Sequence, residues 1–303
     1  MLRSTLLYLS ECEAPRKLIS RLPAGKRLAT CFIAGEHLDE AVHVVRQLNH
    51  DGFDVTLDLL GESVSDRAAA EQASLAYTAI LERIAAEGLR SHISIKLTQL
   101  GLAIGAGVAH QNLSPIWQAA AGRHNFVRID MEGSAYTQST LRVFYEAGAP
   151  RDSLGVVIQS YLYRSEKDVD DLLKHGARIR LVKGAYKEPP EIAFPRKEDV
   201  DRNFIMLMKK LLASGNDHAI ATHDPAMIQA TKTFARESRL KQDGFEFQML
   251  YGIRRDLQNQ LKEEGYRVRI YVPYGGQWYA YFMRRLAERP ANLIFLLKNL
   301  GRN

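Results

Sequence analysis

The chain contains 303 residues, of which 46% are apolar and 25% are charged, and its formal net charge is +6. This composition is typical of a globular protein with a large core, and it excludes disordered and fibrous proteins. No apolar run approaches the roughly 18 residues of a membrane helix, and acidic residues interrupt the N-terminal MLRSTLLYLSE before it resembles a secretory signal. We therefore expect an intracellular protein.

The basic residues and the cysteines restrict the expected ligands. Positive charges are scattered among acidic residues and form no basic tract, so we expect no nucleic-acid partner. The two cysteines, Cys12 and Cys31, belong to no Cys-x-x-Cys pair. Neither a disulfide framework nor a zinc knuckle is therefore expected.

Residues 1–52 are predicted to form an N-terminal helical segment that packs on the rest of the chain. The sequence EHLDEAVHVVRQLNHDG has the apolar periodicity of an amphipathic helix that ends at Gly52. The preceding RLATCFIAG is interpreted as an extended piece. No residue of this segment is a candidate for catalysis.

From Phe53 onward, short apolar runs alternate with helical stretches. The predicted strands are, in chain order, DVTLDLL, HISIKL, FVRIDM, LGVVIQ, ARIRLVKG, HAIATH, FEFQML and VRIYVP. Helices are predicted at 65–87, 134–147, 165–175, 199–214 and 225–238. Repeated strand–helix units require parallel pairing, and eight of them predict a (β/α)8 barrel over residues 53–303. The alternative is an open doubly wound sheet, which would need a Gly-rich first turn where the chain has LLGESVSD.

Polar residues follow nearly all of the predicted strands, at the end of a barrel where active sites form. They include Asp58, Lys96, Asp130, Glu132, Gln159, Tyr161, Arg180, Lys183, Tyr186, Thr222, His223, Asp224, Gln248 and Tyr271. Charged side chains inside a barrel are unfavourable unless they pair with each other or meet a ligand. Lys96 and Asp130 could form an acid–base pair or a buried ion pair, and we favour the ion pair.

The sequence RLVKGAYK has features of a cofactor site. Arg180 and Lys183 flank an apolar pair, and Gly184 permits close approach of the backbone to a flat or charged group. A phosphate-bearing cofactor would fit, and so would an ordinary strand end with solvated basic residues. The glycines of GLAIGAG do not complete a GxGxxG pattern, because His110 stands at the third position, and we interpret this loop as a flexible connection.

The sequence ATHDP places a polar triplet before Pro225 at the start of a predicted helix. This arrangement could hold sugar hydroxyls or a pyrophosphate near a helix N-terminus. His218, His223 and Asp224 could instead bind a divalent metal ion, but no second pair of histidines near another strand end supports a metal site.

The sequence YVPYGGQWYAYFMRRLAERP combines a strand, a Pro/Gly break and a helix predicted at about 277–289. Helical spacing puts Tyr281, Arg284, Arg285 and Glu288 on one side of this helix. Two adjacent guanidinium groups repel each other, and Glu288 can neutralise only one of them, so this face is suited to bind a carboxylate. The alternative is a solvated surface helix with one ion pair.

Together these motifs resemble the proline dehydrogenase family, and in particular its single-function bacterial branch. The resemblance covers about residues 53–300, through YxxRRxxE at 281–288, IKL at Lys96, RID at Asp130, VIQ at Gln159, RLVKGAY at 180–186, ATHD at 221–224 and FQML at 247–250. It implies a distorted TIM-like barrel that binds FAD non-covalently and oxidises L-proline to Δ1-pyrroline-5-carboxylate. It also implies a membrane quinone as electron acceptor, a cytoplasmic location with peripheral association at the inner face of the membrane, and a pyrroline-5-carboxylate dehydrogenase as a further partner.

The resemblance also implies roles for individual residues. The substrate site would consist of Lys96, Asp130, Tyr186, Leu250, Tyr271, Tyr281, Arg284, Arg285 and Glu288, in which Lys96 and the two arginines hold the carboxylate. The flavin contacts would be Gln159, Arg180, Val182, Lys183, Gly184, Ala185, Thr222 and His223. Tyr271 would favour proline over hydroxyproline, and no metal ligand is implied. The alternative functions are a metal-dependent barrel hydrolase and a basic, non-enzymatic binding protein.

Overall fold

The computed structural model describes residues 30–61 and 63–288. Within them, the strands form one closed, parallel barrel in chain order, with the last strand paired to the first. The strands are β1 (Asp54–Leu59), β2 (Ser91–Ile95), β3 (Val127–Ile129), β4 (Leu154–Gln159), β5 (Arg178–Val182), β6 (Ala219–Ala221), β7 (Glu246–Leu250) and β8 (Arg267–Tyr274). The predicted (β/α)8 barrel is thus confirmed, with each predicted strand in its place.

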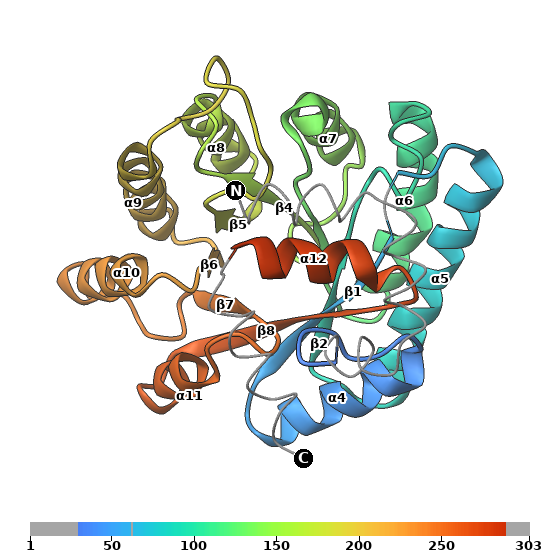
Figure 1. The fold of residues 1–303 in the computed structure, drawn as a ribbon, viewed down its shortest axis with the longest axis horizontal. Helices are drawn as coiled ribbons and strands as arrows, with labels where there is room; N and C mark the ends of the chain where they lie inside the picture. Colours follow the sequence, from blue (N-terminus) through green and yellow to red (C-terminus); the bar gives the residue numbers. More distant parts are fainter. Residues whose placement is uncertain (1–29, 62, 289–303) are drawn as a thin grey trace.

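Helices surround the barrel in the order of the chain (Figure 1). They are α5 (Arg67–Ala86), α6 (Ala106–Ala121), α7 (Ser134–Glu146), α8 (Ser165–Lys174), α9 (Lys197–Ala213), α10 (Pro225–Glu237) and α11 (Arg255–Glu263). Local chemistry determines several of their starts: α10 begins with Pro225, and the Asp224 carboxylate accepts the Ala226 N–H at 3.0 Å. The large core lies between the strands and this ring of helices.

Two helices depart from a regular barrel. Helix α4 (Leu38–His50) packs against β1 and β8 and lies between α11 and α5, where a regular barrel has the helix that follows β8. Helix α12 (Trp278–Glu288) does follow β8, but it lies across the carboxyl end of the barrel in Figure 1. The barrel is therefore distorted so that its last helix covers the end where the active site is expected.

The interior of the barrel is polar. Buried residues inside it include Thr56, Asp58, Ser94, Arg128, Arg180, Glu246, Gln248 and Arg269. Arg180 on β5 donates a hydrogen bond to Ser94 on β2 at 3.0 Å, which joins opposite sides of the barrel. The interiors of such barrels are ordinarily filled by branched apolar side chains. Burial of these charged groups costs free energy, which pairing between opposite charges has to offset.

Three expectations about local structure need correction or stay open. Helices α6 and α11 were not predicted, and the loop expected at GLAIGAG is instead a turn whose last glycine, Gly107, already lies in α6. RLATCFIAG was expected to be extended, but residues 30–33 form turns and a bend, and only Ala34 and Gly35 run beside the end of β8, where the Ala34 N–H donates to the Pro273 carbonyl. Residues 1–29 lie outside the described part of the chain, so the boundary at residue 53 stays a prediction. Among the helices described, none is long and apolar enough to cross a membrane.

Candidate active site

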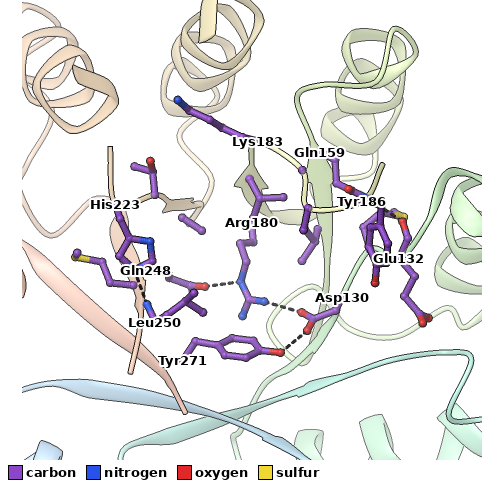
Figure 2. A pocket seen from close by; sticks show the side chains of 18 of the residues that line it. Asp130, Glu132, Gln159, Arg180, Lys183, Tyr186, His223, Gln248, Leu250 and Tyr271 are labelled. Atoms are coloured by element: carbon purple, nitrogen blue, oxygen red, sulfur yellow. Dashed lines mark hydrogen bonds and ion pairs between the residues drawn. The ribbon is translucent and has the colours of Figure 1, made fainter. Parts of the chain in front are cut away.

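A cavity of about 450 Å³ lies at the carboxyl end of the barrel (Figure 2). It is lined by residues of β4 to β8, by residues that follow the strands, including those directly after β2 and β3, and by Arg285 of α12. All the residues predicted to contact the flavin line this cavity: Gln159, Arg180, Val182, Lys183, Gly184, Ala185, Thr222 and His223. Of the residues predicted for the substrate site, Lys96, Asp130, Tyr186, Leu250, Tyr271 and Arg285 line it as well.

Arg180 occupies the centre of the cavity floor, and each nitrogen of its guanidinium has a partner. Its Nε donates to Gln248 Oε1, its Nη1 to Asp130 Oδ1 at 2.6 Å and its Nη2 to Ser94 Oγ at 3.0 Å. The guanidinium carbon also lies 5.4 Å from the centre of the Tyr271 ring. With three acceptors in different directions, the plane of this buried cation is fixed before any ligand arrives.

Asp130 joins Arg180 to Tyr271. Its Oδ1 accepts from Arg180, and its Oδ2 accepts the Tyr271 hydroxyl at 2.7 Å. Burial, followed by the carboxylates of Asp130 and Asp58, raises the pKa of Tyr271 well above its usual value. Tyr271 is therefore a neutral phenol that donates its proton to Asp130.

Lys96 pairs with Asp58 rather than with Asp130. The distance between Lys96 Nζ and Asp58 Oδ1 is 2.9 Å, and the two side chains are 10% and 1% exposed. Burial alone lowers the pKa of Lys96, but the carboxylates of Asp58 and Asp130 outweigh it and raise this pKa above its ordinary value. The predicted Lys96–Asp130 ion pair is therefore wrong. Lys96 pairs with the Asp58 carboxylate of β1, and Asp130 pairs with Arg180 instead.

Lys183 points away from Arg180 toward helices α9 and α10 (Figure 2). Its ammonium is paired with the Asp201 carboxylate and with Asp224 Oδ2 at 2.7 Å. A phosphate at this position would therefore have to share Lys183 with two carboxylates. From the sequence, Lys183 was either a phosphate contact or a solvated basic residue, and its two carboxylate partners were not predicted.

Gly184 and Gln159 explain the shape of the adjacent wall. Gly184 has φ of +124°, and a Cβ there would lie 2.4 Å from the Tyr161 ring, so this position requires glycine for packing as well as for its backbone angle. Gln159 Nε2 donates to the Glu132 carbonyl at 2.8 Å. Its Oε1 is buried and has no hydrogen-bond partner within the described residues.

The histidines do not form a metal site. His223 Nε2 accepts the Leu250 N–H at 2.8 Å, and His218 Nδ1 accepts the Ile179 N–H at 3.1 Å at the opposite end of β6. These bonds occupy ring nitrogens that a metal would need. Over residues 30–61 and 63–288, no three His, Cys, Asp or Glu side chains are grouped to hold an ion. The metal-dependent alternative therefore has no ligand set in this part of the chain.

Helix α12 contributes Arg285 to the cavity. Its guanidinium carbon lies 5.2 Å from the centre of the Tyr281 ring, and Tyr281 is buried in a cluster with Phe32, Ile33 and Trp278. Tyr281 was predicted to belong to the substrate site, but it does not line the cavity and instead contacts the Arg285 guanidinium through its ring. The side chains of Arg284 and Glu288 lie outside the described residues.

Several lining residues were not included among the predicted site residues. Met131, Glu132, Val157, Asp224, Gln248 and Met249 line the cavity, and Asp58 and Ser94 act just below it on Lys96 and Arg180. Asp58, Glu132, Asp224 and Gln248 follow or end predicted strands, so their position was a usable signal. Nothing in the sequence identifies Ser94, because its role depends on Arg180 crossing the barrel.

Comparisons with known proteins show which family the chain belongs to. A family model described as Proline dehydrogenase matches residues 41–298. The chain belongs to the proline dehydrogenase family. It is 43% identical over 302 residues to Proline dehydrogenase 2 of Bacillus subtilis (strain 168), with 98% of each chain covered, and 41% identical to Proline dehydrogenase of Deinococcus radiodurans, with 95% of each covered.

The proline dehydrogenase fold is also found in a larger protein. The crystal structure of proline utilization A from Bdellovibrio bacteriovorus, inactivated by N-propargylglycine, superposes with a TM-score of 0.83 at 27% identity. The match covers 92% of this chain and 34% of that one, so the chain spans about a third of the larger protein. The full-length similarity to the Bacillus and Deinococcus enzymes agrees with the single-function branch that its motifs resemble.

Proposed function

We propose that this proline dehydrogenase oxidises L-proline to Δ1-pyrroline-5-carboxylate with a non-covalently bound FAD. The observation that carries the proposal is the convergence, in one cavity at the carboxyl end of the barrel, of cations from two directions: Lys96 on the β2 side and Arg285 from α12. Apolar and aromatic side chains, Leu250 and Tyr186 among them, line the same cavity. A small zwitterion needs such a combination, an anchor for its carboxylate and an apolar wall for its ring.

The residues around Arg180 fit a flavin. The buried Gln159 Oε1 lacks a hydrogen-bond partner among the described residues, and it is an acceptor of the kind that a flavin ring N–H would satisfy. Val182, Gly184, Ala185, Thr222 and His223 would hold the remainder of the cofactor, together with Lys183. When bound, FAD supplies the acceptor for the hydride that leaves the substrate.

The residues of the chain then have separate tasks. Arg285, with Arg284 and Lys96, would bind the carboxylate and orient the substrate, and the cationic Lys96 would favour the neutral form of the substrate amine. Arg180, held rigidly by its three acceptors, would place positive charge where negative charge develops. Helix α12, which lies across the carboxyl end of the barrel in Figure 1 and contributes Arg285 to the cavity, would limit the access of water.

The proposal extends to the electron acceptor. A reduced cofactor must be reoxidised in every cycle, and we propose a membrane quinone as oxidant, with the protein bound peripherally at the inner face of the membrane. A pyrroline-5-carboxylate dehydrogenase would consume the product. These partners rest on the family alone.

The cofactor can be tested on the purified protein. We expect visible absorption typical of a flavin, and we expect denaturation to release FAD into the protein-free filtrate. A colourless preparation that does not bind added FAD would refute the proposal, and flavin that stays attached to the denatured chain would refute its non-covalent binding.

A further inference from the structure

A chain of hydrogen bonds runs along the barrel interior, from the cavity floor to the opposite end. Arg180 Nε donates to Gln248 Oε1, and Gln248 Nε2 donates to Glu246 Oε1. Glu246 in turn accepts from Arg269 Nε at 3.0 Å on both carboxylate oxygens. Gln248 and Glu246 are both buried and lie two residues apart on β7, so their side chains point into the barrel on the same side of the strand.

The ionised Glu246 determines which way the Gln248 amide faces. A carboxylate is an acceptor only, so it takes the NH2 group of the amide and turns the amide oxygen toward Arg180. With the amide reversed, Gln248 would present its NH2 to the Arg180 Nε–H, and two donors would face each other. Burial disfavours the charge on Glu246, but the Arg269 guanidinium outweighs this and holds the pKa of Glu246 below its usual range.

We propose that Glu246 is a positioning residue for catalysis, which acts through the Gln248 amide to fix the Arg180 guanidinium in the cavity. This inference rests on the proposed role of Arg180 beside the flavin. Glu246 itself is 2% exposed, does not line the cavity and reaches Arg180 only through Gln248. Its effect on the reaction is therefore indirect.

A Glu246→Gln substitution has a specific consequence. In the protein, Oε1 of Glu246 accepts hydrogen bonds from both Gln248 Nε2 and Arg269 Nε. A glutamine at this position has one acceptor oxygen, which the charged Arg269 will take, and its NH2 then faces Gln248. Gln248 must turn its oxygen toward this NH2 and its own NH2 toward Arg180, which displaces the guanidinium.

The test measures the flavin and the substrate separately. In Glu246→Gln, we expect the equilibrium between oxidised and reduced flavin to shift about tenfold toward the oxidised form, or about 30 mV for a two-electron couple. We also expect the rate constant for flavin reduction by proline to fall about tenfold, because a preorganised cation has been moved. The dissociation constant for proline should change by less than about twofold, since the carboxylate anchors remain.

Asp54→Asn is the matched control. Asp54 also faces Arg269, with Oδ2 at 3.4 Å from Nη2, and its loss removes a carboxylate from the same end of the barrel without touching Gln248. A purely structural role for these charges predicts that both variants alter thermal stability and leave the flavin potential unchanged. The positioning role predicts a shifted potential in Glu246→Gln alone.

Gln248→Leu keeps the inference testable if Glu246→Gln does not fold, because it removes the amide and leaves the Glu246–Arg269 pair in place. We expect a potential shifted in the same direction and, where Glu246→Gln does fold, no additional shift when both substitutions are combined. Wild-type potentials in Glu246→Gln, or in Gln248→Leu, would overturn the inference while leaving the proposed function intact. Failure of the wild-type protein to reduce flavin with proline would instead overturn the proposed function.

Discussion

Lys96→Met should destabilise the protein strongly and in a pH-dependent manner, because it leaves the Asp58 carboxylate buried beside an apolar side chain. In the protein, Lys96 Nζ lies 2.9 Å from Asp58 Oδ1, and the Asp58 side chain is 1% exposed. Breaking a buried pair by removing one partner costs about 3 to 5 kcal/mol. We therefore expect this loss in the free energy of unfolding at pH 8.

The pH dependence of this loss of stability follows from the direction in which the pKa of Asp58 is shifted. Burial already raises the pKa of Asp58 above its ordinary value, against the opposing effect of Lys96, and removing Lys96 raises it further. When the pKa of a carboxyl group is higher in the folded than in the unfolded state, its burial does not destabilise the protein below the unfolded-state pKa, because the group is protonated in both states. Stability is lost as the pH rises from there through the folded-state pKa. Each pH unit between the two values costs about 1.4 kcal/mol, so the penalty should be much smaller at pH 5 than at pH 8.

Urea-induced unfolding of the wild-type protein and of Lys96→Met, at pH 5 and pH 8, measures both effects. In the double variant Asp58→Asn/Lys96→Met, most of the lost stability should return, because neither position of the pair then carries a buried, unpaired charge. Proline binding should not return, since the carboxylate anchor is still missing. A loss below about 1 kcal/mol at pH 8, or a loss equal at both pH values, would refute the reasoning about this pair.

Four further predictions concern the site and the barrel. Arg285→Met should lower kcat/KM for proline roughly 30-fold or more without altering the flavin spectrum, whereas values within about twofold of wild type would exclude Arg285 from the substrate site. Lys183→Ala should weaken FAD binding roughly 10-fold or more, which equilibrium dialysis would measure, and unchanged affinity would exclude Lys183 from the cofactor site. Tyr271→Ser should lower kcat/KM for proline and raise the ratio for hydroxyproline over proline, because it opens space for a 4-hydroxyl group; equal losses for both substrates would make Tyr271 a packing residue. Burial lowers the pKa of His218 to about 4 from 6.5, so stability present above pH 6.5 should fall by up to about 3 kcal/mol as the pH drops toward 4, and His218→Asn should flatten this slope in urea titrations.

The strands and most helices could be predicted because their signals are local. Most strands are short runs rich in apolar residues with polar residues near their carboxyl ends, and these runs alternate with helical stretches along the chain. Helix α6 escaped prediction because Pro115 lies inside it and Gly107 in its first turn, both of which oppose helix formation in isolation. Helix α11 was missed because it is short and mostly polar, with only Leu257 and Leu261 as buried apolar residues.

In the candidate site, too, features with a local sequence signal could be predicted and features that depend on the assembled barrel could not. The position of a residue at a strand end predicted most of the cavity lining, since parallel strands bring their carboxyl ends together. The partners of the charged residues could not be predicted in this way. Lys96 pairs with Asp58 instead of Asp130, and Arg180 bonds to Ser94 across the barrel, because these contacts depend on the closure and register of the whole sheet. The place of α12 across the end of the barrel could not be predicted either, because local sequence does not show that α4 packs beside β8, where the last helix of a regular barrel lies.

Anaerobic addition of L-proline to the purified, FAD-loaded protein tests the central claim most directly. We expect the flavin absorption to bleach, with one Δ1-pyrroline-5-carboxylate formed for each flavin reduced, and the colour to return when a quinone is added. A spectrum that stays unchanged under saturating L-proline would contradict the account.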